Sequence, residues 1–115
     1  MTEQEAREAH IKMWDWLIKN PKKTKEDWPG WQLNGGEYPR QYSSCFACTV
    51  AANLYLCTHN EKPNGYAKCS FCPLNLSPED QCSSVNSVYI RWAHGISKRK
   101  MAIQLRDAWP EVPNG

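Results

Sequence analysis

The chain has 115 residues, of which 41% are hydrophobic and 23% charged, and its formal net charge is +2. The mean hydropathy is −0.72 and no apolar run approaches the roughly 20 residues of a membrane span, so we expect no membrane partner. The chain begins with the polar, acidic residues MTEQE, unlike a secretory signal, which predicts a cytoplasmic protein with reduced thiols.

The first predicted element is a helix over residues 1–20. Thr2 and Glu5 have the spacing of a capping box, and Asn20 followed by Pro21 ends the pattern. The apolar residues of this helix cover a wider arc than the stripe of an ordinary surface helix. We therefore expect it to lie in a groove between other elements, with contact to a partner as the alternative.

The middle of the chain has fewer regular patterns. Residues 21–44 combine tryptophan with proline and glycine, which predicts a loop with one helical turn at residues 24–27. Residues 49–57 are apolar and rich in alanine and leucine, which favours a short helix. Residues 77–80, with the sequence SPED, have the features of a further helix start.

Residues 83–110 are predicted to form two helices that are separated at Gly95. Ser97 is the expected cap of the second helix, and Pro110 is expected to end it. The apolar stripe of this second helix contains Met101, Leu105, Ala108 and Trp109.

Four of the six cysteines form two Cys-x-x-Cys pairs. Cys45 with Cys48 and Cys69 with Cys72 are separated by 20 residues, close to the spacing of zinc-binding knuckle pairs. Two thiolates three residues apart on a tight turn can reach one ion, and four soft thiolates select a tetrahedral zinc ion. We therefore predict zinc as a structural cofactor.

Other interpretations of the cysteines stay open. Cys82, Cys57 or His59 can replace one of the four ligands, and these residues with His94 can hold a second ion. Three disulfides or an iron–sulfur cluster would use the same residue type, although the chain lacks a secretory context for disulfides.

These elements predict a mainly α-helical, zinc-stabilised single domain over residues 1–115. Its parts are the N-terminal helix at 1–20, a tryptophan-rich loop at 21–44, a zinc-knuckle region at 45–82 and two C-terminal helices at 83–110.

The sequence contains no convincing catalytic constellation. The three histidines are dispersed, and the motifs of phosphate-binding loops, zinc peptidases and serine hydrolases are missing. A site with four thiolates has no open position for water, so we expect no zinc catalysis and no enzyme. A zinc-supported nuclease with His94 as base is the alternative, although His94 is interpreted most simply as the last residue of a helix.

Two sets of residues are candidates for binding a partner. Trp28 and Trp31 flank a Pro-Gly turn and are the best candidates for an exposed aromatic pair that anchors a protein interface. The alternative is that these rings cover a thin core. The second set consists of basic residues of the last two helices, namely Arg91, Lys98, Arg99, Lys100 and Arg106, together with Lys22, Lys23 and Lys25. These charges fit a nucleic acid or an acidic protein surface.

One combination of motifs spans most of the chain. It consists of Glu5-Ala6, His10, MWDWLI at 13–18, Lys25, WPGW at 28–31, the two Cys-x-x-Cys pairs with Pro73-Leu74, Cys82, Ser87, Tyr89 and Trp92. In this combination the chain resembles a group of small cysteine-rich proteins from phages and prophages of Gram-positive bacteria. It departs from the group in a longer linker after Cys48 and in the presence of Cys57. The resemblance implies an accessory protein of the bacterial cytoplasm that binds a host protein, such as a defence component, and modulates or inhibits that protein. The resemblance also favours contact of Cys82 with the metal site.

Overall fold

The computed structural model of the chain describes residues 2–40, 45–59, 72–75 and 87–111. Within these ranges the protein contains four α-helices, two short 3-10 helices and no β-strand, so the predicted mainly α-helical class is confirmed. The elements are α1 (Glu3–Lys19), η1 (Lys25–Asp27), η2 (Gln32–Asn34), α2 (Phe46–His59), α3 (Val88–Ala93) and α4 (Lys98–Asp107).

None of the helices described is both long and apolar enough to cross a membrane. The predicted helix start at residues 77–80 lies outside the described residues.

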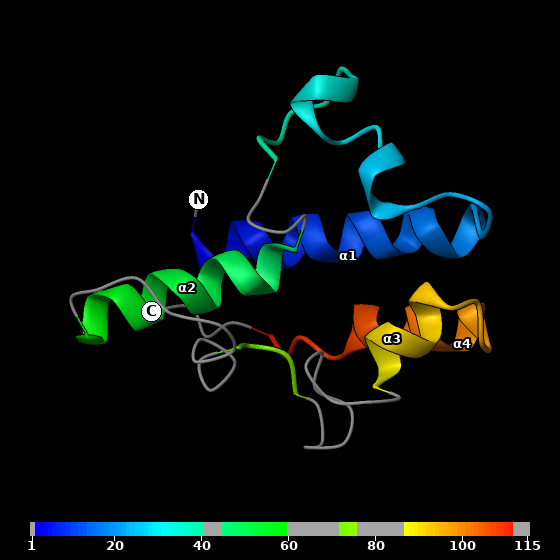
Figure 1. Cartoon of the computed structure of the whole chain (residues 1–115). Helices are drawn as coiled ribbons and strands as arrows, with labels where there is room; N and C mark the ends of the chain where they lie inside the picture. The colour runs from blue at the N-terminus through cyan, green and yellow to red at the C-terminus, as the bar shows by residue number, and fades with distance from the viewer. Residues whose placement is uncertain (1, 41–44, 60–71, 76–86, 112–115) are drawn as a thin grey trace.

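Helix α1 has the start and the end that its sequence predicts. The Thr2 hydroxyl accepts the N–H of Glu5 at 3.1 Å, and the Glu5 carboxylate accepts the N–H of Thr2 at 3.1 Å, which completes the capping box. Asn20 is the C-cap residue. The helix packs against both α2 and α4 (Figure 1), so the expected groove between other elements is confirmed. Its buried side chains are Ala6, Ala9, His10, Met13, Trp14 and Leu17.

Helix α2 is longer than the segment 49–57 that its composition predicts. It begins at Phe46, because Phe46 and Ala47 are fully buried and attach the first turn to the core. The prediction was wrong at this boundary, since a short apolar segment has too few residues for its period to mark the first turn. Cys48 consequently lies within the helix.

Helix α3 ends at Ala93, and Gly95 follows its C-cap at the position where the sequence places the break between the two C-terminal helices. Gly95 has a positive φ of 79°. Its N–H donates to the carbonyl of Trp92 at 3.0 Å, and the N–H of Ile96 donates to the carbonyl of Arg91 at 2.8 Å. This pair of bonds satisfies the last carbonyls of the helix and turns the chain towards α4.

The start of α4 differs from its prediction in one respect. Ser97 occupies the N-cap position, as expected, but its hydroxyl makes no capping hydrogen bond and its φ is 47°. Helix α4 packs on both α3 and α1, and tertiary packing of this kind stabilises a helix that lacks a hydroxyl cap.

Residues 21–40 form a packed arm that lies beside α1 (Figure 1). The helical turn predicted at residues 24–27 is confirmed as η1, where the Asp27 carboxylate accepts the N–H of Thr24 at 3.0 Å. Further along the arm, a Cβ atom at Gly36 would lie 2.2 Å from the carbonyl oxygen of Gly30, so only glycine allows this close approach of two backbone segments.

The core is built largely from aromatic rings. Five of the six tryptophans are buried, and Trp16 is partly buried against the core. One group of rings joins the arm to the start of α2 and contains Trp28, Trp31, Tyr38 and Phe46. A second group joins α1 to the C-terminal helices and contains His10, Trp14, Tyr89, Trp92 and Trp109. In a chain of this size, such large side chains supply a large share of the area that is removed from water.

Candidate metal centre and basic surface

The first Cys-x-x-Cys pair lies at the start of α2. Cys45 immediately precedes the helix and Cys48 lies in its first turn, where its N–H donates to the Cys45 sulfur Sγ at 3.4 Å. Hydrogen bonds from Cys48, together with the nearby ammonium of Lys25, lower the pKa of the Cys45 thiol from 9.0 to about 6, although burial opposes this shift. The thiolate, which is the form that binds zinc, is therefore favoured at neutral pH.

Both thiols line a cavity of about 130 Å³. Its walls are mostly apolar and come from α1, α3, α4, the start of α2 and Leu74. His10 and Lys25 add an imidazole and an ammonium. The sequence separates these four residues by as many as 38 positions, and only the fold brings them to one cavity.

Only part of the predicted zinc site lies within the described residues. Cys72 is half-buried and packs against the core. No three His, Cys, Asp or Glu side chains form a metal-binding group in the portion of the chain that the structure describes. Cys69 and Cys82 lie outside that portion, as do the side chains of Cys57 and His59. The structure thus describes the first Cys-x-x-Cys pair, and the four-ligand zinc site stays a prediction.

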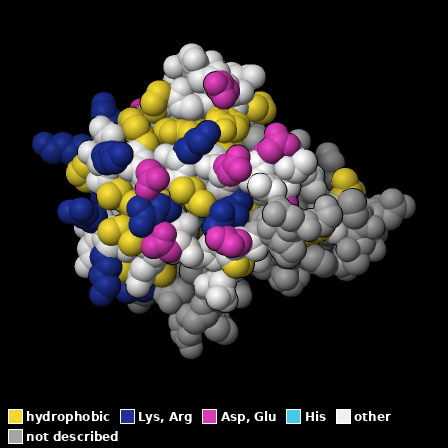
Figure 2. All heavy atoms as spheres, turned by 180° about the vertical axis from the view of Figure 1, so that it is seen from behind, with side chains coloured by type: hydrophobic (Ala, Val, Ile, Leu, Met, Phe, Trp, Pro, Cys, Tyr) yellow, Lys and Arg dark blue, Asp and Glu magenta, His cyan; other side chains and the backbone are white. Residues whose placement is uncertain are grey.

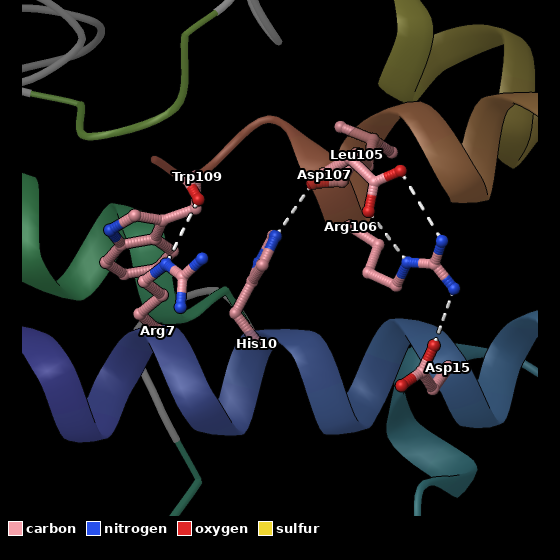
Figure 3. A network of polar contacts seen from close by, with 7 residues as sticks. All are labelled: Arg7, His10, Asp15, Leu105, Arg106, Asp107 and Trp109. Carbon is pink, nitrogen blue, oxygen red and sulfur yellow. Dashed lines mark hydrogen bonds and ion pairs between the residues drawn. The ribbon is translucent and has the colours of Figure 1, made fainter. Parts of the chain in front are cut away.

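Polar contacts join α1 to α4 and to the segment after it (Figure 3). The His10 Nε2–H donates to the carbonyl of Leu105 at 2.7 Å. The Arg7 Nε–H donates to the carbonyl of Trp109 at 3.1 Å. Because a carbonyl can only accept, His10 is held as the neutral tautomer with its proton on Nε2.

The buried imidazole makes stability depend on pH. Burial lowers the pKa of His10 from 6.5 to about 4, against the raising effect of its bond to Leu105. Since protonation is easier in the unfolded chain, His10 contributes stability that is complete above pH 6.5 and lost as the pH falls to about 4. We expect a loss on the order of 3 kcal/mol across this window. Urea denaturation at a series of pH values measures it, and a His10→Gln variant, which keeps a donor near Leu105, should lack this part of the dependence.

The two tryptophans proposed as an exposed pair are in fact buried. Trp28 is 5% exposed and Trp31 is 0% exposed. Trp31 stacks on Phe46 with 5.0 Å between ring centroids, and Trp28 stacks on Tyr38 at 5.7 Å. The expectation of a surface aromatic pair was therefore wrong, and the alternative, that these rings cover a thin core, is confirmed. The Pro-Gly turn between the two residues folds the rings inward onto α2.

The basic residues, in contrast, come together on the surface. The Lys98 ammonium donates to the carbonyl of Pro21, which holds the first turn of α4 beside the turn that follows α1. Lys and Arg side chains consequently gather at one end of the molecule, on the left of Figure 2. We call the following residues the basic end: Lys19, Lys22, Lys23, Lys98, Arg99 and Lys100. Neither of the segments 19–25 and 94–106 contains an acidic residue.

The other predicted contact residues of the C-terminal helices have different environments. Arg106 pairs with Asp15 at 2.8 Å and with Asp107 at 2.9 Å (Figure 3), so it joins α4 to α1 and does not belong to the basic end. Arg91 is half-buried on α3. His94 is the exposed C-cap residue of α3, as the sequence predicts.

Lys25 is the residue whose role sequence patterns do not reveal. It is only 8% exposed and lines the thiol cavity and also a larger cavity between η1 and α3. A lysine between Thr24 and Glu26 has the signature of a solvated helical turn, and nothing local marks it as buried.

Comparison of the chain with protein-family models, with curated proteins and with solved structures finds no match.

Proposed function

We propose that this chain is a small, non-enzymatic binding protein of phage or prophage origin, stabilised by structural zinc, that docks its basic end on an acidic surface of a host protein. Through this contact it would modulate or inhibit the host protein, for example a component of a defence system. The observation that carries the proposal is the convergence of two lysine-rich segments on one end of the fold.

The two segments that converge are far apart in the sequence, because Lys98 and Pro21, which share a hydrogen bond, are separated by 77 positions. A run of basic residues on one helix is usually a solvated face, whereas two runs on one surface produce a common positive potential. Such a surface speeds encounter with an acidic partner and selects against basic ones. Since Trp28 and Trp31 belong to the core, charge and not an aromatic anchor is the main feature of the interface.

Zinc enters the proposal through the first knuckle. Cys45 and Cys48 face one cavity, and the low pKa of Cys45 suits a metal-bound thiolate. With Cys69 and Cys72 as the second pair, the ion would have four sulfur ligands and no position for water. Its role would then be to hold the fold and not to catalyse a reaction.

Charge reversal at the basic end tests the docking surface. We expect the double variant Arg99→Glu with Lys100→Glu to weaken binding of the captured host protein about tenfold. Both positions are exposed, so the two new carboxylates would repel the acidic surface of the partner. Affinity capture from host lysate, followed by titration of the recovered protein, measures the effect. Lys12→Glu is the matched control, since Lys12 is exposed on α1 outside the basic end. Equal losses in both variants would contradict a localised surface.

Nucleic acid is the second candidate partner, and the same convergence of cations favours it. Binding to a phosphate backbone would fall steeply with salt, because each contacted phosphate releases counterions. It would also weaken for all sequences alike when Arg99 and Lys100 are replaced by alanine. Capture repeated after nuclease treatment separates the two cases: a stoichiometric protein that survives nuclease supports the first proposal, and recovery that disappears supports the second.

A further inference from the structure

A second cavity lies between η1 and helices α3 and α4. Its volume of about 460 Å³ is within the range of small-molecule sites, which is roughly 300–1,000 Å³. The lining residues with charge or aromatic character are Lys25, Glu26, Arg40, Tyr89, Trp92 and Lys98.

Two ammonium groups lie over aromatic rings in the wall of this cavity, and that of Lys98 also donates to the carbonyl of Pro21. The Lys25 Nζ lies 4.4 Å from the centroid of the Tyr89 ring, and the Lys98 Nζ lies 5.2 Å from that of Trp92. The rings are neighbours on α3, with 5.9 Å between their centroids. The lysines therefore come from two distant segments, η1 and α4, and are brought together by one pair of rings.

Lys25 forms no ion pair with an Asp or Glu side chain within the described residues. It is only 8% exposed, and its ammonium lies over the face of Tyr89 and near the Cys45 thiol. The nearest acid in the lining, Glu26, instead pairs with Arg40 at 3.1 Å. A buried ammonium is costly unless an opposite charge or a hydrogen-bond acceptor compensates it.

The charges of the cavity indicate the class of ligand. Three cations and one carboxylate line it, so the net charge of the lining is 3 − 1 = +2. A dianionic group with several acceptor oxygens complements this charge.

We propose that this cavity binds a phosphate group, with Lys25 and Lys98 as its two cationic contacts. The volume exceeds that of a phosphate ion and accommodates a mononucleotide. The phosphate can belong to a free phosphate ester or to the backbone of a nucleic acid. The proposal does not depend on the host protein partner, because the cavity lies beside the exposed charges of the basic end and shares only Lys98 with them.

The test is titration of the full chain with inorganic phosphate, then with AMP, followed by nuclear magnetic resonance of the backbone amides of residues 89–98. We expect saturable shifts there, and an affinity about tenfold lower in Lys98→Met, which keeps the side-chain stem and removes the charge. Lys100→Met is the matched control: it removes the same charge two residues away, from a side chain that does not line the cavity, and should change the affinity less than twofold.

Two outcomes would overturn the proposal, namely no saturable shift with phosphate or AMP, and equal losses in the Lys98 and Lys100 variants. Lys25→Met should weaken binding at least as much as Lys98→Met, provided that circular dichroism shows an intact fold. If Lys25→Met does not fold, the comparison of Lys98 with Lys100 still decides. Tighter binding of AMP than of a short single-stranded oligonucleotide assigns a free ester, and the reverse order assigns a nucleic-acid phosphate.

Discussion

Replacement of Trp31 by alanine is expected to lower the free energy of unfolding by about 3–5 kcal/mol. The ring is completely buried, stacks on Phe46 and meets Trp28 edge-on at 5.2 Å. Its indole N–H also donates to the carbonyl of Lys25 at 2.8 Å. The variant would therefore leave a cavity at the point where the arm joins α2. It would also remove one of the two N–H donors to the Lys25 carbonyl, which keeps the bond from Trp28. Because small domains have total stabilities of roughly 5–15 kcal/mol, a large share of the protein would unfold.

Urea denaturation followed by circular dichroism measures this loss. Leu33→Ala is the matched control, since Leu33 lies two residues along the same arm and is 63% exposed, so its replacement should change stability by less than about 0.5 kcal/mol. If Trp31→Ala unfolded at the same urea concentration as Leu33→Ala but lost its partner, Trp31 would be a binding anchor, and its burial in the core would be refuted.

Removal of zinc is expected to have the second large effect. Structural zinc sites bind with apparent free energies of about 10–16 kcal/mol at pH 7, and this energy becomes folding energy when no site exists in the unfolded chain. We therefore expect protein purified under reducing conditions to contain stoichiometric zinc and to lose order between Cys45 and Cys72 after chelation. The contacts between α1 and α4 use no predicted ligand, so part of the helical signal should remain.

Elemental analysis and circular dichroism before and after chelation measure these effects. Cys45→Ser and Cys72→Ser should each lose the metal, and the comparison of Cys57→Ser with Cys82→Ser shows which of the open alternatives, if either, is a ligand. A protein without stoichiometric metal, or with these thiols oxidised in pairs inside cells, would contradict the zinc centre.

The parts of the fold that the sequence predicts well are those that local contacts determine. The capping box of Thr2 with Glu5 and the turn at Thr24 to Asp27 involve residues three apart, and the break at Gly95 needs only one left-handed residue. Each of these signals is complete within a few residues. For that reason they survive unchanged in the folded protein.

The parts that sequence does not predict depend on partners far along the chain. Trp28 and Trp31 resemble surface anchors until Phe46 covers them, and α2 begins earlier than predicted because Phe46 itself is buried. The basic end needs the contact of Lys98 with Pro21, which no local pattern encodes. Tertiary packing decides all three features, and it decides the depth of Lys25 as well.

The bond between His10 and Leu105 spans 95 positions, and this has a consequence for synthesis on the ribosome. At about 5–20 residues per second, α1 emerges on the order of ten seconds before α4. During that interval the nascent chain exposes side chains of α1 that are buried in the folded protein, among them Met13, Trp14 and Leu17. The packing of α1 is therefore completed only after α4 has been synthesised, and a chain that stalls before residue 98 leaves the apolar face of α1 exposed to chaperones and to other nascent chains.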